Sequence, residues 1–201
     1  MGAIFLFPGK EIFSDGTAQI ARSLGYTRSA GPSAEISTLI EKASLEMQAV
    51  LNPQAVFEIF DLTAEAEKIT FADVTINSRN LGENLKGCTK IALLAATIGP
   101  QPDRLILKNS RTNPAYASVL HAAGAVLIEQ LVDFVNDEIK KIARENGQQT
   151  RPRYSPGFGD VPLQIQRDFF RLLPCARIGL SLMDTLIMAP EKSVTAFVGL
   201  L

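Results

Sequence analysis

The residues best suited to binding chemistry lie together in the stretch 151–162, RPRYSPGFGDVP. Arg151 and Arg153 are permanently charged, and a planar guanidinium matches a carboxylate or a phosphate. Three prolines each fix one φ angle, while Gly157 and Gly159 allow a positive φ and a close approach of a ligand to the main chain. The stretch therefore predicts a loop that is ordered in advance to hold an anionic group. An ordinary surface turn uses the same residue types, so both interpretations stay open on composition alone.

The residues after this loop predict the start of a helix. Asp160 is suited to cap a helix and Pro162 to occupy its first turn, so we expect a helix over 163–173 that ends before Pro174. The segment 151–177 has an excess of three positive charges in a chain whose net charge is −1. A helix N-terminus and focused positive charge at the loop both favour an anion.

Side chains suited to acid-base or metal chemistry are few and scattered. His121 is the only histidine, and its small neighbours in a predicted long helix favour a buried structural role over that of a general base. Cys88 and Cys175 adjoin apolar segments, which favours two reduced, half-buried thiols over a disulfide. One histidine and two distant cysteines do not make a typical zinc site. We expect no catalytic residue and no metal ligand.

The acidic residues of the first third of the chain are interpreted as a solvated face. They are Glu58, Asp61, Glu65 and Glu67. No G-x-S-x-G elbow or functional phosphate-binding loop is present.

Length and composition limit the class of protein. With 201 residues and 46% apolar content, we expect one domain over 1–201, with 1–50 as an N-terminal helical part. A net charge of −1 argues against nucleic-acid binding, and no apolar run is long enough to suggest a membrane span. The opening segment is unlike a signal peptide, because Pro8 and Gly9 interrupt its apolar run. A cytoplasmic protein is the simplest expectation.

Hydrophobic periodicity predicts an α+β fold, with helices packed around a mixed or antiparallel sheet. The longest helix is expected to begin at Asn113-Pro114, and the apolar run 90–97 is typical of a central strand buried on both faces. The predicted helices are 17–24, 33–51, 79–86, 102–110, 114–144 and 163–173; the predicted strands are 4–7, 55–60, 69–76, 90–97, 178–182, 185–188 and 194–200.

The order of motifs in the last third of the chain resembles a known family. The segment RYSPGF (153–158), Pro162, a helix, IGLSL (178–182) and MAPEKSV (188–194) are similar to the reactivation (S-adenosylmethionine-binding) domain of cobalamin-dependent methionine synthase. The resemblance is specific over 153–194, looser over 51–145 and weakest before Gly25. The chain resembles the short, stand-alone form of this domain.

This resemblance implies a fold, a ligand and site residues. The fold would have helices around a twisted, mainly antiparallel sheet, with a groove for S-adenosylmethionine beside the loop. Arg153 would hold the methionine part of the ligand, with Ser155 and Gly157 as main-chain neighbours. Phe158 stands where the family has a tyrosine that is expected to face cobalamin. The family's C-terminal tyrosines, which contact the adenosyl part, have no counterpart here, so adenine recognition is unassigned.

The resemblance also implies a function. In the family, cob(II)alamin is reduced by a flavodoxin-type donor and trapped by methyl transfer from S-adenosylmethionine. This methyl transfer moves no proton, so positioning the two cofactors is sufficient for catalysis. We expect an S-adenosylmethionine-binding protein that supports reductive methylation of a cobalamin-dependent methionine synthase, or a related corrinoid protein, in trans, with cobalamin presented by that partner. One alternative is an interaction protein of the same fold that has lost S-adenosylmethionine binding. Another is an enzyme that uses S-adenosylmethionine, or another carboxylate ligand, on an unrelated acceptor.

Overall fold

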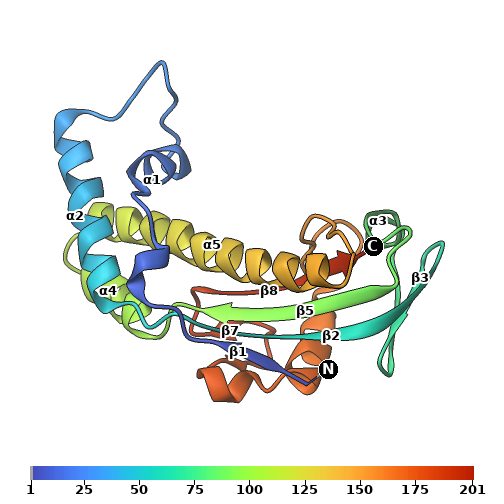
Figure 1. The fold of residues 1–201 in the computed structure, drawn as a ribbon. Helices are drawn as coiled ribbons and strands as arrows, with labels where there is room; N and C mark the ends of the chain where they lie inside the picture. The colour runs from blue at the N-terminus through green and yellow to red at the C-terminus, as the bar shows by residue number, and fades with distance from the viewer. Residues whose placement is uncertain (1) are drawn as a thin grey trace.

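A twisted antiparallel sheet forms the centre of the computed structural model, which describes residues 2–201 (Figure 1). Five strands lie in the order β4 (Val74–Asn77), β3 (Lys68–Phe71), β2 (Gln54–Glu65), β5 (Lys90–Thr97) and β8 (Ser193–Leu200). The short strand β1 (Ile4–Leu6) pairs with the start of the long strand β2, and β3 pairs with its end. The α+β fold with a mainly antiparallel sheet is confirmed.

The central strand β5 is buried on both faces, as its continuous apolar run predicts. Successive side chains of a strand point to opposite faces. Leu94 and Ala96 accordingly belong to one hydrophobic core, and Leu93 and Ala95 to the other.

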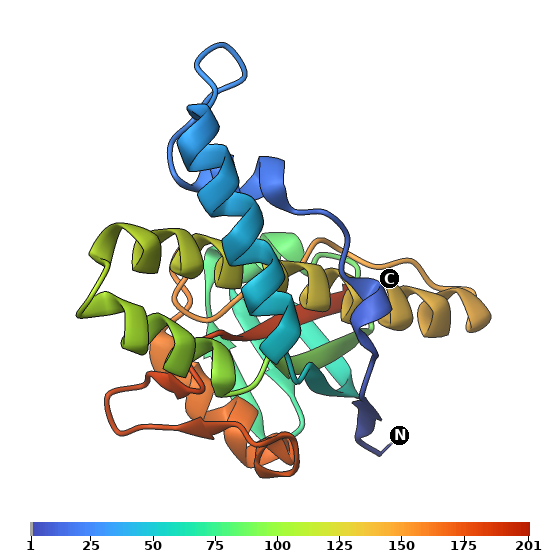
Figure 2. The same ribbon diagram turned by 90° about the vertical axis from the view of Figure 1, so that its left-hand side faces the viewer.

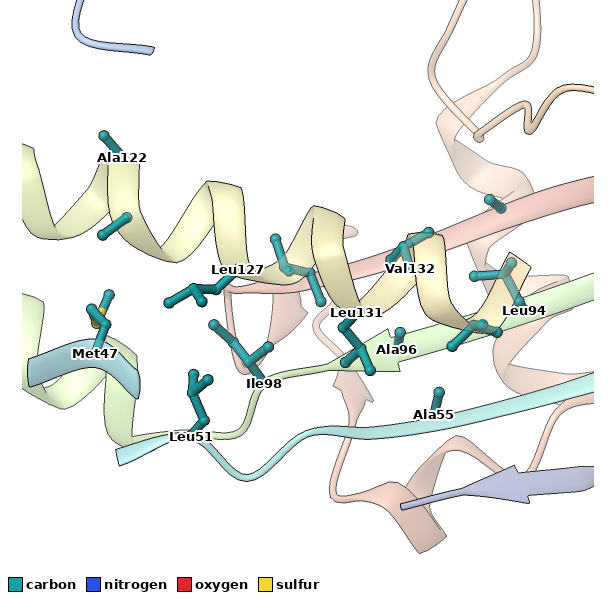
Figure 3. Packing of buried hydrophobic residues seen from close by; sticks show 14 of the residues in the cluster. Met47, Leu51, Ala55, Leu94, Ala96, Ile98, Ala122, Leu127, Leu131 and Val132 are labelled. Atoms are coloured by element: carbon teal, nitrogen blue, oxygen red, sulfur yellow. The ribbon is translucent and has the colours of Figure 1, made fainter. Parts of the chain in front are cut away.

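The long helix α5 (Pro114–Glu145) covers the first of these faces. The Asn113 side chain caps it by accepting a hydrogen bond from the Tyr116 N–H at 3.1 Å, and Pro114 occupies the first turn. Helices α2 (Ala34–Val50) and α4 (Gln101–Ser110) pack against its first half. Figure 3 shows Leu127, Leu131 and Val132 of α5 above Leu94 and Ala96 of β5. By length and composition α5 could cross a membrane, but 56% of its apolar window is buried within this fold.

The second face is covered by shorter elements of the C-terminal third. They are α6 (Gln166–Leu172), the 3₁₀ turns Leu163–Ile165 and Cys175–Ile178, the strand pair β6 (Ser181–Leu182) and β7 (Met188–Ala189), and, from earlier in the chain, α3 (Arg79–Asn84). The Phe169 ring of α6 lies 4.7 Å from the Phe197 ring of β8, measured between centroids. Figure 1 shows α5 and the C-terminal helices on opposite sides of the sheet.

The N-terminal segment packs against the helical side. The 3₁₀ turn Lys10–Ile12 and α1 (Thr17–Ser23) both contact α5, and α1 also contacts α2. The connection between α1 and α2 extends away from the rest of the molecule (Figure 2).

Three predicted elements differ in the structure. The strand expected over 69–76 is a hairpin, because the chain turns at Ala72, which has a φ of +48°. Of 178–182 only Ser181–Leu182 is a strand, since a 3₁₀ turn closes in the left-handed conformation at Gly179. The strand expected over 185–188 is β7, which lies at Met188–Ala189.

The two cysteines are free, as predicted, but both are fully buried and not half-buried. Burial raises the pKa of the Cys175 thiol to about 12. Such a thiol is a packing group and not a nucleophile at neutral pH.

Candidate ligand-binding groove

The chain segment after α5 runs along the free edge of β8. The Arg151 N–H donates to the Gly199 carbonyl at 2.9 Å, and Tyr154 and Phe197 exchange N–H···O bonds of 3.0 and 2.7 Å. The segment 149–154 therefore acts as an irregular outer strand, which places Arg153 at the edge of the sheet. After Tyr154 the loop leaves this edge.

Where the loop departs, the main chain of Thr195 is left without a partner on this edge of β8. Alternate residues of an antiparallel strand direct their N–H and C=O groups to the same edge, so Thr195 points outward as Phe197 and Gly199 do. Among residues 2–201 no hydrogen bond is found to the Thr195 N–H or C=O on this side. One backbone donor and one acceptor are left for a ligand.

A groove of about 680 Å³ opens at this point, and we call it the β8 groove. This volume is within the usual range for a small-molecule site. One wall is a face of α5, the other comprises α6 and β7, and the loop 153–159 and the start of β8 complete it. Its lining residues are Glu129, Asp133, Asn136, Arg153, Tyr154, Ser155, Pro156, Phe158, Gly159, Gln166, Met188, Ser193, Val194 and Thr195.

Arg153 lines the groove between two carboxylates of α5. Its guanidinium contacts Glu129 at 3.2 Å and also donates to Asp133, which lies one helical turn further along α5. The side chain is 23% exposed, so it is not sealed inside the protein. Two of the five guanidinium N–H donors are used in these pairs, which leaves donors for a ligand.

The groove has one more carboxylate than cation. The prediction of free positive charge focused at this loop is therefore wrong. The arginines of 151–177 are largely used inside the protein. Arg171 pairs with Asp73 and Asp168, Arg151 donates to the Lys86 carbonyl, and Arg177 stacks on the Phe5 ring at 4.0 Å. A count of charges along the sequence cannot include these distant partners.

Asp160 fixes the far end of the loop, but to a different helix from the one predicted. It accepts hydrogen bonds from the Ser78 hydroxyl and from the main-chain N–H of Arg79, at 2.8 Å, and so caps α3. The Ser78 hydrogen bond, with those from the Arg79 and Asn80 amides, holds the pKa of the Asp160 carboxyl below its usual value. The expected helix after Pro162 begins with a 3₁₀ turn that has no side-chain cap. The predicted anion site at that helix start gains no support.

The predicted site residues occupy different places in the loop. Arg153, Ser155 and Phe158 line the β8 groove together. The Phe158 ring is at the surface, with 68% of the residue exposed. Gly157 does not line the groove; it has a φ of +88°, and its N–H donates to the Val161 carbonyl at 3.0 Å, so it shapes the turn.

Four charged or amide side chains of the groove were not anticipated from the sequence: Glu129, Asp133, Asn136 and Gln166. The first three share one face of α5 at a helical spacing, a signal that was available. Gln166 gave none. Its Oε1 and the Asn136 Oδ1 are buried and have no hydrogen-bond partner among residues 2–201.

The prediction of a buried His121 is wrong. Its side chain is half exposed, and its Nδ1 lies 3.0 Å from the Lys192 Nζ. Lys192 also donates to Glu191 at 2.7 Å, which lowers the pKa of the Glu191 carboxyl. Small neighbours such as Ala122 and Ala123 are buried, but they mark only one face of the helix. Within residues 2–201, no group of three His, Cys, Asp or Glu side chains is arranged to hold a metal ion.

Comparison with known proteins supports a fold assignment. No family model matches the sequence, and no curated protein matches it. Among solved structures, a crystal structure of the MetH reactivation domain bound to AdoHcy is similar, with a TM-score of 0.70. The alignment covers 99% of this chain and 78% of that one at 15% sequence identity. The chain thus has the curled α+β fold of that reactivation domain.

Proposed function

We propose that this chain binds S-adenosylmethionine in the β8 groove and supports reductive methylation of a cobalamin-dependent methionine synthase, or a related corrinoid protein, in trans. The observation that carries the proposal is a groove beside Arg153 in a fold matched over nearly the whole chain by a domain solved with AdoHcy. Cobalamin would be presented by the partner. A flavodoxin-type electron donor and a cytoplasmic location are part of the same proposal.

The charges of the groove fit those of the ligand. S-adenosylmethionine has a carboxylate, an ammonium and a sulfonium group, and its net charge is +1. The free donors of Arg153 and the Thr195 N–H would hold the carboxylate. Glu129 and Asp133 would hold the ammonium group and favour the sulfonium. The extra carboxylate of the groove complements the net charge of the ligand.

The contribution of the chain would be binding and orientation. When bound, S-adenosylmethionine supplies an electrophilic methyl group. Phe158, exposed at the rim of the groove, would contact the partner with its ring. Loop rigidity supports this role, because Asp160 ties one end of the loop to α3 and Tyr154 ties the other to β8.

Titration calorimetry with S-adenosylmethionine tests the proposal. Arg153→Ala is expected to weaken binding by about 1.5 to 3 kcal/mol, the scale of a hydrogen bond to a charged group. Fold stability should change little, because the carboxylates left behind on α5 are exposed to solvent.

Two matched variants serve as controls. Arg167→Ala removes an exposed arginine of α6 whose guanidinium makes no hydrogen bond within the described residues. Lys90→Ala removes a cation outside the β8 groove. Both should bind as the unaltered chain does. Unchanged affinity in Arg153→Ala would remove Arg153 from the site, and no binding by the unaltered chain would reject the proposal.

One observation favours a second candidate, an interaction protein that docks on a corrinoid protein without S-adenosylmethionine. The exposed Phe158 lies next to another exposed apolar residue, Leu163, whose side chain reaches Gly157. Retention of a purified corrinoid protein by this chain, together with a flat S-adenosylmethionine titration, would favour this candidate.

A further inference from the structure

Two buried carboxamide oxygens without hydrogen-bond partners lie in the β8 groove. Six buried side-chain atoms in residues 2–201 lack a hydrogen-bond partner, and two of them, Gln166 Oε1 and Asn136 Oδ1, belong to residues that line this one groove. Gln166 is only 7% exposed, and neither atom of its amide is hydrogen-bonded to the protein. An unpaired buried amide is costly, so each one calls for a physical explanation.

Packing does not explain a glutamine at this position. Gln166 is the first residue of α6, next to Ile165, and the same helix buries Phe169 in the core. A leucine would fill a similar volume without an unpaired amide. The final torsion of a glutamine side chain is soft, so the amide can turn toward a ligand in the groove.

The two carboxamides share the groove with its charged residues. On α5, Asn136 lies three residues past Asp133 and seven past Glu129, which corresponds to roughly 5 Å and roughly 10 Å along the helix axis. The groove therefore offers a ligand neutral donor-acceptor groups as well as charged groups. This combination suits a ligand with a zwitterionic end and a neutral heterocyclic end.

We infer that Gln166 reads the purine base of the ligand, with Asn136 as a second contact, an inference that rests on the proposed function. A carboxamide presents one donor and one acceptor side by side. The edge of adenine presents the complementary pair, an amino group beside a ring nitrogen, and glutamine or asparagine pairs with it through two hydrogen bonds. Gln166 is thus a specificity-determining residue for a 6-aminopurine nucleoside.

The test compares Gln166→Leu with the unaltered chain against three ligands, by titration calorimetry. The ligands are S-adenosylhomocysteine, its analogue without the 6-amino group, and adenosine. We expect Gln166→Leu to weaken S-adenosylhomocysteine binding about tenfold or more, the discrimination given by a two-bond pair. For the analogue without the amino group, the two proteins should differ much less, since half of the pair is already missing.

Two controls separate base recognition from damage to the fold. Gln164→Leu changes an exposed glutamine two residues earlier and should leave all three affinities unchanged. The melting temperature of Gln166→Leu should stay the same or rise, because the variant removes an unpaired buried amide.

The outcomes distinguish this inference from the proposed function. Suppose that S-adenosylhomocysteine binds the unaltered chain. If Gln166→Leu then binds it equally well, or loses as much affinity for the analogue without the 6-amino group as for S-adenosylhomocysteine, base reading by Gln166 is wrong and the proposed function stands. If only adenosine binds, and does so through Gln166, base reading stands and the proposed function is wrong. If no ligand binds the unaltered chain, both are overturned.

Discussion

Two of the open grooves in this chain differ in what lines them: one of about 840 Å³ lies between β2, β3, β5 and the end of α5, and the other is the β8 groove, of about 680 Å³. The larger one is lined by exposed charges. Its Lys90 lies 3.3 Å from Asp61, and both side chains face solvent. The β8 groove contains two buried carboxamide oxygens without partners and an unpaired strand edge.

We take unpaired polar groups, and not volume, as the guide to the candidate ligand site. An exposed ion pair is hydrated with or without a ligand, so it gains little on binding. A buried amide oxygen without a protein partner gains its hydrogen bond from whatever occupies the groove, a ligand or water. Three further experiments test this difference between the grooves.

The first experiment tests whether the two grooves depend on one core. The Phe197 ring packs against Phe169 of α6 and, at 5.8 Å between centroids, against Phe71, which lines the larger groove. Phe197→Ala should lower the free energy of unfolding by about 3 to 5 kcal/mol, measured by urea denaturation. Phe7→Ala, at an exposed phenylalanine, should cost less than about 1 kcal/mol. Equal losses in both variants would contradict a shared core.

The second experiment tests the close packing of the loop at Gly159. This glycine has a φ of +55°, and a Cβ there would lie only 2.3 Å from the Tyr154 hydroxyl and 2.4 Å from the Asn80 Nδ2. Gly147 also has a positive φ, but nothing lies within 4 Å of its Cβ position. Gly147→Ala should cost about 1 to 2 kcal/mol for the backbone alone, and Gly159→Ala about 1 to 3 kcal/mol more for the clash.

The same pair of glycine variants distinguishes the two regions by binding. Only Gly159→Ala should weaken S-adenosylmethionine binding, because only it displaces the loop of the β8 groove. If the two variants were equally stable and bound equally well, the loop would not be closely packed at this position.

The third experiment measures the charge preference of the β8 groove. The unaltered chain should bind S-adenosylmethionine more tightly than S-adenosylhomocysteine by about 1 kcal/mol, the interaction of two charges about 4 Å apart in water. Replacing both carboxylates, in Glu129→Gln with Asp133→Asn, should abolish this preference. The matched pair Glu58→Gln with Asp61→Asn, in the larger groove, should leave it intact. If the preference survived in the Glu129→Gln, Asp133→Asn double variant, groups other than these two carboxylates would be its cause.

Much of the fold could be predicted from the sequence because its determinants are local. Asn113 and Pro114 start α5, and the apolar run of β5 indicates burial on both faces. The prolines and glycines of 151–162 mark a loop that borders the β8 groove. The hairpin at Ala72 was missed because a non-glycine residue in the left-handed conformation has no clear sequence signal.

Caps, φ restrictions and periodicity act over a few residues, so the helices, the central strand and the position of a stiff loop could be predicted from the sequence. The pairing of the charges and amides depends instead on the tertiary structure. Asp160 caps a helix 80 residues earlier, Arg153 meets the carboxylates of α5, and Gln166 is left without a partner. The physical reason is range: a hydrogen bond or an ion pair forms between whichever groups the fold brings together, however far apart they are along the chain.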